Sequence, residues 1–252
     1  MRLLNKFEGI VLKARDYGES HQIVTVFTEF LGKVALMARG SKKTKSRFSA
    51  VTEPFTVAHF VSFGGGGIVS LSQADLLDSH HGIRSDLLLT SYGAYWFELI
   101  DKSLAEKEPH PAFYRLLKTL LSRLEQGTDP EILTRVIELR ILSLAGSAPV
   151  LDHCAHCRQD SRPVRFSVTQ GGFLCEACAH LDPRGLSVSP AVARILPLLG
   201  RLAPERMGEV SVKAETNEQL EALLRAFMQE HLPWECKSHA LLDSIRKTWA
   251  GG

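Results

Sequence analysis

The first 80 residues carry their hydrophobic side chains in five short runs, each bounded by glycine, proline, aspartate or serine. β-Branched and aromatic residues dominate these runs, which is typical of strands. Because the connections are too short to contain crossover helices, we expect antiparallel pairing. The four glycines at 64–67 accommodate positive φ angles and predict a hairpin turn. The predicted strands lie at residues 10–12, 23–28, 33–38, 55–61 and 68–71.

Beyond about residue 82, leucine, isoleucine and aromatic residues recur at the spacing of amphipathic helices. One helix should begin at Asp129-Pro130-Glu131, which supplies a cap, a proline at the first helical position and an early acid. Thr216 and Gln219 have the spacing of a capping box before a later helix. The helical runs lie at 87–100, 113–124, 132–142, 195–199, 220–227 and 241–249.

This order of strands and helices predicts a multi-domain α+β protein. Five strands in about 80 residues match the size of an OB-type β-barrel, and a small SH3-like barrel is the alternative. We expect an OB-fold domain at residues 1–80 and an α-helical domain at residues 81–252. A four-cysteine zinc module, at about residues 150–182, should be embedded in the helical domain.

Four of the five cysteines stand in two Cys-x-x-Cys pairs that are 17 residues apart. Zinc binds four thiolates in a tetrahedron, and this separation lies in the range of four-cysteine zinc sites. Two disulfides are the alternative, and a metal is favoured because the apparent compartment is reducing. Four thiolates leave no coordination position for water, so the metal should be structural. The predicted Zn²⁺ ligands are Cys154, Cys157, Cys175 and Cys178.

Positive charge is concentrated between Leu31 and Ala50, where six lysines and arginines occur without an acid. The whole chain has a formal net charge of only +2, which conceals this local field. On an OB-type barrel such a segment favours binding of nucleic-acid backbone, whereas a solvated loop is the alternative. The predicted DNA-contacting residues are Lys33, Arg39, Lys42, Lys43, Lys45 and Arg47. Candidates for base stacking, most of which the strand alternation assigns to the core, are Phe48, Phe55, Phe60 and Phe63.

Common catalytic motifs do not occur in the sequence. Gly32-Lys33 lacks the upstream glycine of a phosphate-binding loop, and serine-hydrolase, metalloprotease and zinc-deaminase motifs are missing. We therefore expect a binding protein without enzymatic turnover. The N-terminal residues lack the apolar core of a signal peptide, and no run of about 18 apolar residues predicts a membrane span. A cytoplasmic protein is expected.

Several groups of residues, none diagnostic alone, recur in a specific order and spacing over nearly the whole chain. They are Tyr17–Thr28 with Gly32-Lys33 and residues 38–46; Glu138–Leu142 with Gly146, Pro149, Leu151 and Cys154/Cys157; Phe166-Ser167 with Gly171-Gly172 and Cys175/Cys178; and Lys237-Ser238. In this arrangement the sequence resembles the RecO family of bacterial recombination mediators.

The resemblance implies an OB domain, a helical domain with a zinc module, and binding of single- and double-stranded DNA without strong sequence preference. It further implies ATP-independent annealing of complementary strands in the RecF pathway of DNA repair and homologous recombination. The implied partners are RecR, the acidic C-terminal tail of single-strand-binding protein (SSB) and, indirectly, RecA, which is loaded onto SSB-coated DNA. Such a protein would be associated with the nucleoid. Some family members lack the cysteines, which supports a scaffolding role for the metal.

Two other functions stay open at this point. The chain could be a zinc-ribbon scaffold for protein interactions, whose basic loop does not contact nucleic acid. It could also be a metal-dependent nuclease, although a pair of acids such as Asp75 and Asp78 is far more often simply polar surface.

Overall fold

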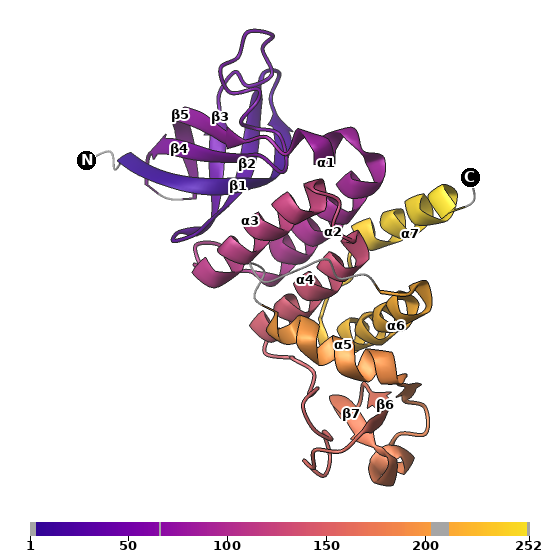
Figure 1. The fold of residues 1–252 in the computed structure, drawn as a ribbon. Coiled ribbons are helices and arrows are strands. Elements are labelled where there is room, and N and C mark those ends of the chain that lie inside the picture. Colours follow the sequence, from indigo (N-terminus) through magenta and orange to yellow (C-terminus); the bar gives the residue numbers. More distant parts are fainter. Residues whose placement is uncertain (1–3, 66, 203–211, 251–252) are drawn as a thin grey trace. The chain divides into compact units, whose positions relative to one another are not determined.

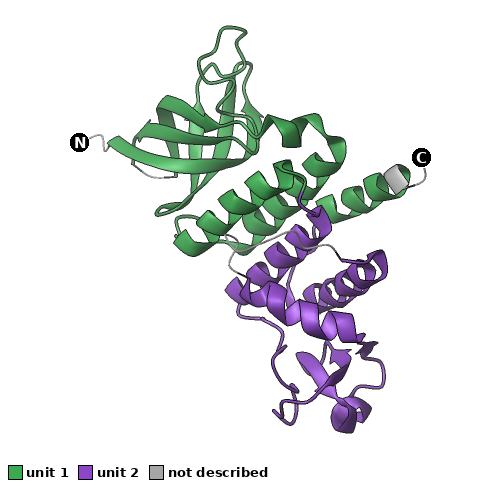
Figure 2. Cartoon of the chain, in the orientation of Figure 1, with its two compact units in different colours: residues 1–127, 238–252 green, residues 128–237 purple. Residues whose placement is uncertain are grey.

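The computed structural model describes residues 4–65, 67–202 and 212–250 (Figure 1). The chain forms two compact units (Figure 2). Unit 1 contains residues 1–127 and 238–252, and unit 2 contains residues 128–237. None of the described helices has both the length and the apolar character needed to cross a membrane.

Unit 1 begins with a closed five-stranded barrel of the predicted OB type. The strand order around the barrel is β1-β2-β3-β5-β4, with β4 returning to pair with β1. All five predicted strands are present, and β1 and β5 extend well beyond their predicted hydrophobic runs. The strands are β1 (Leu4–Tyr17), β2 (His21–Thr28), β3 (Gly32–Ala38), β4 (Val57–Phe63) and β5 (Ile68–Asp78).

The expectation of wholly antiparallel pairing was wrong at one position. β3 and β5 pair in parallel, with Ala35 opposite Ile68 and Met37 opposite Ser70. Parallel neighbours require a crossover connection. Here the loop at residues 39–56, together with β4, forms that crossover, so no helix is needed. β4 and β5 form an antiparallel hairpin, as predicted, and are joined by residues 64–67, of which Gly66 lies outside the described residues.

The barrel core contains the inward-facing side chains of all five strands. Val24, Val26 and Leu36 are at most 1% exposed, as the strand alternation predicts. Two residues of the 39–56 loop, Phe48 and Val51, join this core with exposures of 5% and 3%. These two side chains anchor a loop that has no regular secondary structure over most of its length.

Unit 1 also contains the helices α1 (His81–Ser85), α2 (Leu87–Ser103), α3 (Pro111–Glu125) and most of α7 (Lys237–Ala250). Of these, α2 contacts β1 and α3 contacts β2. Tyr114 of α3 stacks edge-to-face on Phe27 of β2, with ring centroids 5.7 Å apart. Gly93 of α2 lies against the Phe55 ring, where an added Cβ would come within 2.4 Å of a ring carbon. A larger residue at position 93 would therefore push α2 away from the barrel.

The described part of unit 2 combines three α-helices with a small cysteine-bearing module. Its elements are α4 (Pro130–Leu144), β6 (Pro163–Ser167), β7 (Gly172–Cys175), the 3-10 helix η1 (Glu176–Leu181), β8 (Leu186–Ser187), α5 (Pro190–Arg201) and α6 (Ala214–His231). The strand order is β7-β6-β8. Phe166 of β6 joins the module to α6, because its ring centroid lies 5.5 Å from that of Phe227.

One predicted helix start is confirmed and another was wrong. The Asp129 carboxylate caps α4 by accepting hydrogen bonds from the backbone N–H groups of Glu131 and Ile132. The predicted capping box before α6 does not form, because this helix already begins at Ala214. Gln219 instead bonds to β8 and the start of α5: its Oε1 accepts from Ser189 N at 3.0 Å, and its Nε2 donates to the Ser187 carbonyl at 3.2 Å.

The last barrel strand, β5, ends at Asp78, and the division into domains at residue 80 stays a prediction. Unit 1 extends further and includes helices from both ends of the helical region. Independent folding of residues 1–80 stays a prediction.

Candidate metal centre and nucleic-acid interface

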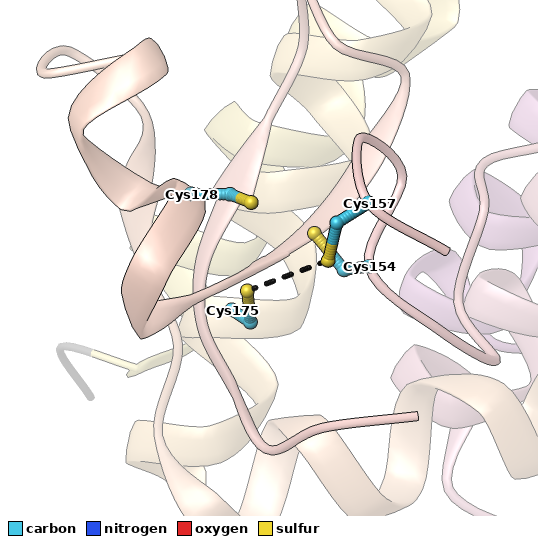
Figure 3. A group of neighbouring side chains, drawn as sticks. All are labelled: Cys154, Cys157, Cys175 and Cys178. Atoms are coloured by element: carbon cyan, nitrogen blue, oxygen red, sulfur yellow. Dashed lines mark hydrogen bonds between the residues drawn. The ribbon is translucent and has the colours of Figure 1, made fainter. Parts of the chain in front are cut away.

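The four cysteines of the two Cys-x-x-Cys pairs converge in unit 2 (Figure 3). Their sulfur atoms all lie within 4.8 Å of one another. Cys154 and Cys157 come from the turn that follows α4, Cys175 ends β7, and Cys178 lies in η1. Cys154, Cys175 and Cys178 are buried, with exposures between 1% and 7%. The sequence thus predicted correctly which four side chains meet.

The spacing of the sulfur atoms fits a tetrahedral metal ion. A tetrahedron with metal–sulfur bonds of about 2.3 Å has edges of about 3.8 Å. The Sγ atoms of Cys157 and Cys175 are 3.8 Å apart. A disulfide needs about 2.05 Å, and all four cysteines are free thiols. These residues could therefore hold a metal ion. If all four thiolates bind it, the tetrahedral coordination shell is complete and has no position for a water molecule.

Backbone geometry around Gly172 brings the two pairs together. The Val150 carbonyl accepts from Phe173 N at 2.9 Å, and Val150 N donates to the Gly171 carbonyl at 2.8 Å. A Cβ at Gly172 would lie 2.2 Å from the Val150 carbonyl oxygen, so no side chain fits there. Ala155 N donates to the Phe173 carbonyl at 2.7 Å, which holds the first cysteine pair against β7. Gly171 has a φ of 79°, which permits the tight turn before β7.

The environment gives the thiols of Cys154 and Cys178 unequal acidity. Burial raises the pKa of Cys154, but backbone N–H groups of Cys175, Cys157 and His156 outweigh it and lower the pKa to about 6. Burial and the neighbouring cysteines raise the pKa of Cys178 to about 12. Four adjacent thiolates repel one another, so full ionisation of the cluster requires a bound cation.

The second candidate site is the basic loop, which we define as residues 39–47 between β3 and β4. Lys43 and Lys45 are exposed and form no ion pair within the described part of the chain. Lys42 pairs with Asp16 of β1. Arg47 donates to the Ser72 carbonyl at 2.9 Å and lies 4.7 Å from the Phe48 ring centroid. The loop is therefore held against β1 and β5, while its lysines face solvent.

Lys33, also predicted to contact DNA, is placed differently from the basic loop. Its side chain is 8% exposed, and its Nζ lies 3.2 Å from Oδ1 of Asp101 near the end of α2. The Lys33 ammonium also donates to the Asp101 backbone carbonyl. Asp101 pairs in addition with Lys13 of β1. The sequence contained no signal for this cluster, because 68 residues separate Lys33 from Asp101.

Three of the four phenylalanines considered for base stacking are core residues. Phe48, Phe55 and Phe60 are 5%, 3% and 0% exposed. Phe63 is half-buried at the end of β4. The strand alternation had assigned most of them to the core, and that assignment is confirmed.

Comparison with known proteins decides the family. The family model "Recombination protein O N terminal" matches residues 1–80. The model "Recombination protein O C terminal" matches residues 84–240. The chain belongs to the RecO family. RecO proteins are DNA repair and recombination proteins, so the barrel and the cysteine cluster are features of a protein of that class.

Curated RecO relatives align with this chain over nearly their whole length. The DNA repair protein RecO of Bacillus subtilis (strain 168) is 39% identical over 243 residues, which is 96% of this chain and 95% of the relative. The RecO protein of Bacillus pumilus (strain SAFR-032) is 39% identical over 252 residues, covering 99% and 98%. That of Shouchella clausii (strain KSM-K16) is 39% identical over 246 residues, covering 97% and 96%.

Proposed function

We propose that this RecO-family protein binds single- and double-stranded DNA through the backbone and anneals complementary strands without ATP. The observation that carries the proposal is the basic loop, anchored on an OB-type barrel with its lysines exposed. Phosphate contacts supply sequence-independent affinity, and single strands bind positive surfaces on barrels of this class. The proposed contacts are Arg39, Lys42, Lys43, Lys45 and Arg47.

Annealing breaks no covalent bond, so a catalytic residue is not needed. Two polyanions must approach each other, and positive charge on the protein offsets their repulsion. The bases must stay free to pair, which fits a loop that supplies lysine and arginine contacts to phosphate. We therefore propose a mediator without enzymatic turnover, acting on DNA in the cytoplasm at the nucleoid.

In the RecF pathway, this mediator would act together with RecR and the SSB C-terminal tail. We propose that the complex helps to load RecA onto SSB-coated DNA. Membership of a DNA repair and recombination family supports this role. RecA filament formation on SSB-coated single strands, measured with and without this protein and RecR, is the corresponding assay. Equal rates in both reactions would remove the loading role.

The metal in the cysteine cluster is proposed to be Zn²⁺. Four thiolates in a tetrahedron are its preferred structural coordination. Cys154, Cys157, Cys175 and Cys178 would all be ligands, so the ion would hold the turn, β7 and η1 together rather than take part in DNA chemistry.

Charge reversal in the basic loop tests the proposed DNA interface. The variant Lys42→Glu, Lys43→Glu, Lys45→Glu should bind a single-stranded oligonucleotide at least about tenfold more weakly, because several phosphate contacts are lost. The slope of log affinity against log salt should decrease by about 0.7 for each lost contact on single strands. An electrophoretic shift across a salt series measures both quantities.

A matched control keeps the same change in net charge. Arg162, Arg184 and Lys213 are exposed cations on separate segments of unit 2, and their reversal to glutamate should weaken binding much less. Equal losses in both triple variants would show that the loop has no special role in binding.

A fluorescence annealing assay without nucleotide or divalent metal distinguishes the other two functions, since a nuclease shortens strands and a protein scaffold leaves them unpaired.

A further inference from the structure

A hollow of about 420 Å³ lies on the outer face of the barrel in unit 1. Aligned residues on four neighbouring strands cross it, because Lys13 pairs with Thr25, Thr25 with Ala35, and Ala35 with Ile68. The floor is mainly apolar, and Ile68 at its edge is 49% exposed. The end of α2 closes one side with Asp101.

The rim of this hollow carries three cations and two acids. Lys13, Arg15 and Lys33 line it together with Asp101 and Glu106. Asp101 binds both lysines, through its carboxylate to Lys13 and through its carboxylate and backbone carbonyl to Lys33. Partial burial raises the pKa of Asp101, but the two ammonium groups outweigh it and keep the pKa below its usual value. The Asp101 carboxylate is thus an anion on the rim that pairs with two of the three cations lining the hollow.

Lys13 and Lys33 differ in how easily each could release the Asp101 carboxylate and bind a phosphate instead. The Lys33 side chain is 8% exposed and is held from two sides by Asp101. The Lys13 side chain is 53% exposed, and exposed ion pairs are weak. Arg15, two residues along β1, is exposed and forms no ion pair with any residue that the structure describes. A phosphate could therefore reach Lys13 and Arg15 while Lys33 stays paired.

We propose that Asp101 occupies the place of a backbone phosphate, and that a single DNA strand displaces it from Lys13 when a nucleotide enters the hollow. This inference rests on the proposed function and adds a regulating residue to it. The apolar floor suits the sugar and the face of a base, whereas the paired bases of a duplex cannot reach it. Asp101 would therefore lower the affinity of the barrel for single strands and keep binding reversible.

The substitution Asp101→Asn tests this inference. It removes the competing anion, so affinity for a poly-dT oligonucleotide should increase by roughly threefold to tenfold. The slope of log affinity against log salt should also become steeper by up to about one. In the unaltered protein the displaced Asp101 carboxylate takes up a cation from solution when DNA binds, and this uptake is lost in the variant. Affinity for blunt duplex DNA should change less. Fluorescence anisotropy across a salt series, with the full-length protein, measures all three.

Two comparisons separate this mechanism from a general change in charge. Asp75→Asn removes one exposed carboxylate from β5, opposite His59 of β4, and should raise affinity much less than Asp101→Asn. In a Lys13→Gln background, Asp101→Asn should lose most of its gain, because the lysine that receives the phosphate is gone. Equal gains from Asp75→Asn and Asp101→Asn, or an undiminished gain without Lys13, would overturn the inference.

Arg15→Gln provides a test that does not depend on the stability of the Asp101 cluster. Arg15 forms no ion pair in the described part of unit 1, so its replacement should leave the fold intact. We expect a roughly twofold to fivefold loss of affinity for single strands, in line with one lost phosphate contact, and a smaller loss for duplex. Unchanged binding to both would overturn the inference. If the unaltered protein fails to bind DNA at all, the proposed function fails instead.

Discussion

Single side chains decide where positive charge on the barrel is available. Lys43 and Lys45 face solvent, whereas Lys33 is buried and held by Asp101. All three belong to the same basic stretch of sequence, and residue type alone could not separate them. The difference arises because Lys33 is in a strand that a helix end covers, while the other two are in a loop. Charge counts along a sequence therefore overstate the number of cations that DNA can reach.

Glu8 gives a residue-scale prediction about pH. It accepts hydrogen bonds from Tyr114 at 2.9 Å and Lys118 at 2.7 Å. Partial burial raises the pKa of Glu8, but these two groups outweigh it, and its pKa lies below the usual value. A lowered folded-state pKa contributes stability above the unfolded pKa of about 4.3, and that stability is lost as the pH falls through the folded pKa.

The variant Glu8→Gln should therefore destabilise unit 1 by roughly 1 kcal/mol at neutral pH. The difference from the unaltered protein should shrink on acidification and disappear below the folded pKa, where Glu8 is itself protonated. Urea unfolding at several pH values measures this. A difference that stays constant with pH would show that packing, rather than the charge of Glu8, is responsible.

The starts of helices and the pairing of strands depend on contacts that differ in sequence separation. The start of α4 was predictable, because Asp129 reaches backbone N–H groups only two and three residues away. The start of α6 was not, because Gln219 bonds to residues 30 and 32 positions earlier instead of capping its own helix. The same distinction explains the parallel β3–β5 pair. The alternation of hydrophobic and polar residues along each strand is a local feature, whereas the closure of the barrel determines which strand lies beside it.

Asp129 allows a prediction at this scale. Besides capping α4, its carboxylate accepts a hydrogen bond from Asn217 of α6 at 3.3 Å. Asp129→Ala should destabilise unit 2 by about 1–2 kcal/mol, because backbone donors at the helix start lose their acceptor. Asp129→Asn keeps a capping oxygen and should cost only a fraction of this. Thermal unfolding followed by circular dichroism compares the two, and equal losses would assign the effect to charge instead of capping.

At the scale of the whole molecule, the barrel and the cysteine module have separate hydrophobic clusters and should respond separately to loss of metal. The hydrophobic cluster at the metal site is small: it consists of Cys154, Leu174, Cys175 and Cys178, with Ala155 packed against it. The barrel core contains no cysteine and is built from side chains of unit 1. Removal of the ion should therefore loosen residues 151–181 and leave the barrel folded.

Chelation of the purified protein tests this. The metal-free sample should be cleaved rapidly by trypsin after Arg158, Arg162 or Arg165, because loss of local order lets the backbone around these residues enter the protease. The barrel should resist cleavage and still bind oligonucleotide. Elemental analysis should find about one zinc per chain before chelation. Unchanged proteolysis and melting after complete metal removal would contradict a structural role for the ion.

The sequence by itself determined the five barrel strands, the helical runs from residue 87 onward, the start of α4 and the identity of the four cysteines that meet. Each of these depends on alternation, helical spacing or turn chemistry within a short stretch of chain, where local sterics and hydrogen bonding dominate. Only the tertiary structure decided the parallel closure of the barrel, the start of α6 and the pairing of Lys33 and Lys13 with Asp101. These features depend on groups that are far apart in sequence. Such groups meet only when the strands and helices pack together to bury the core.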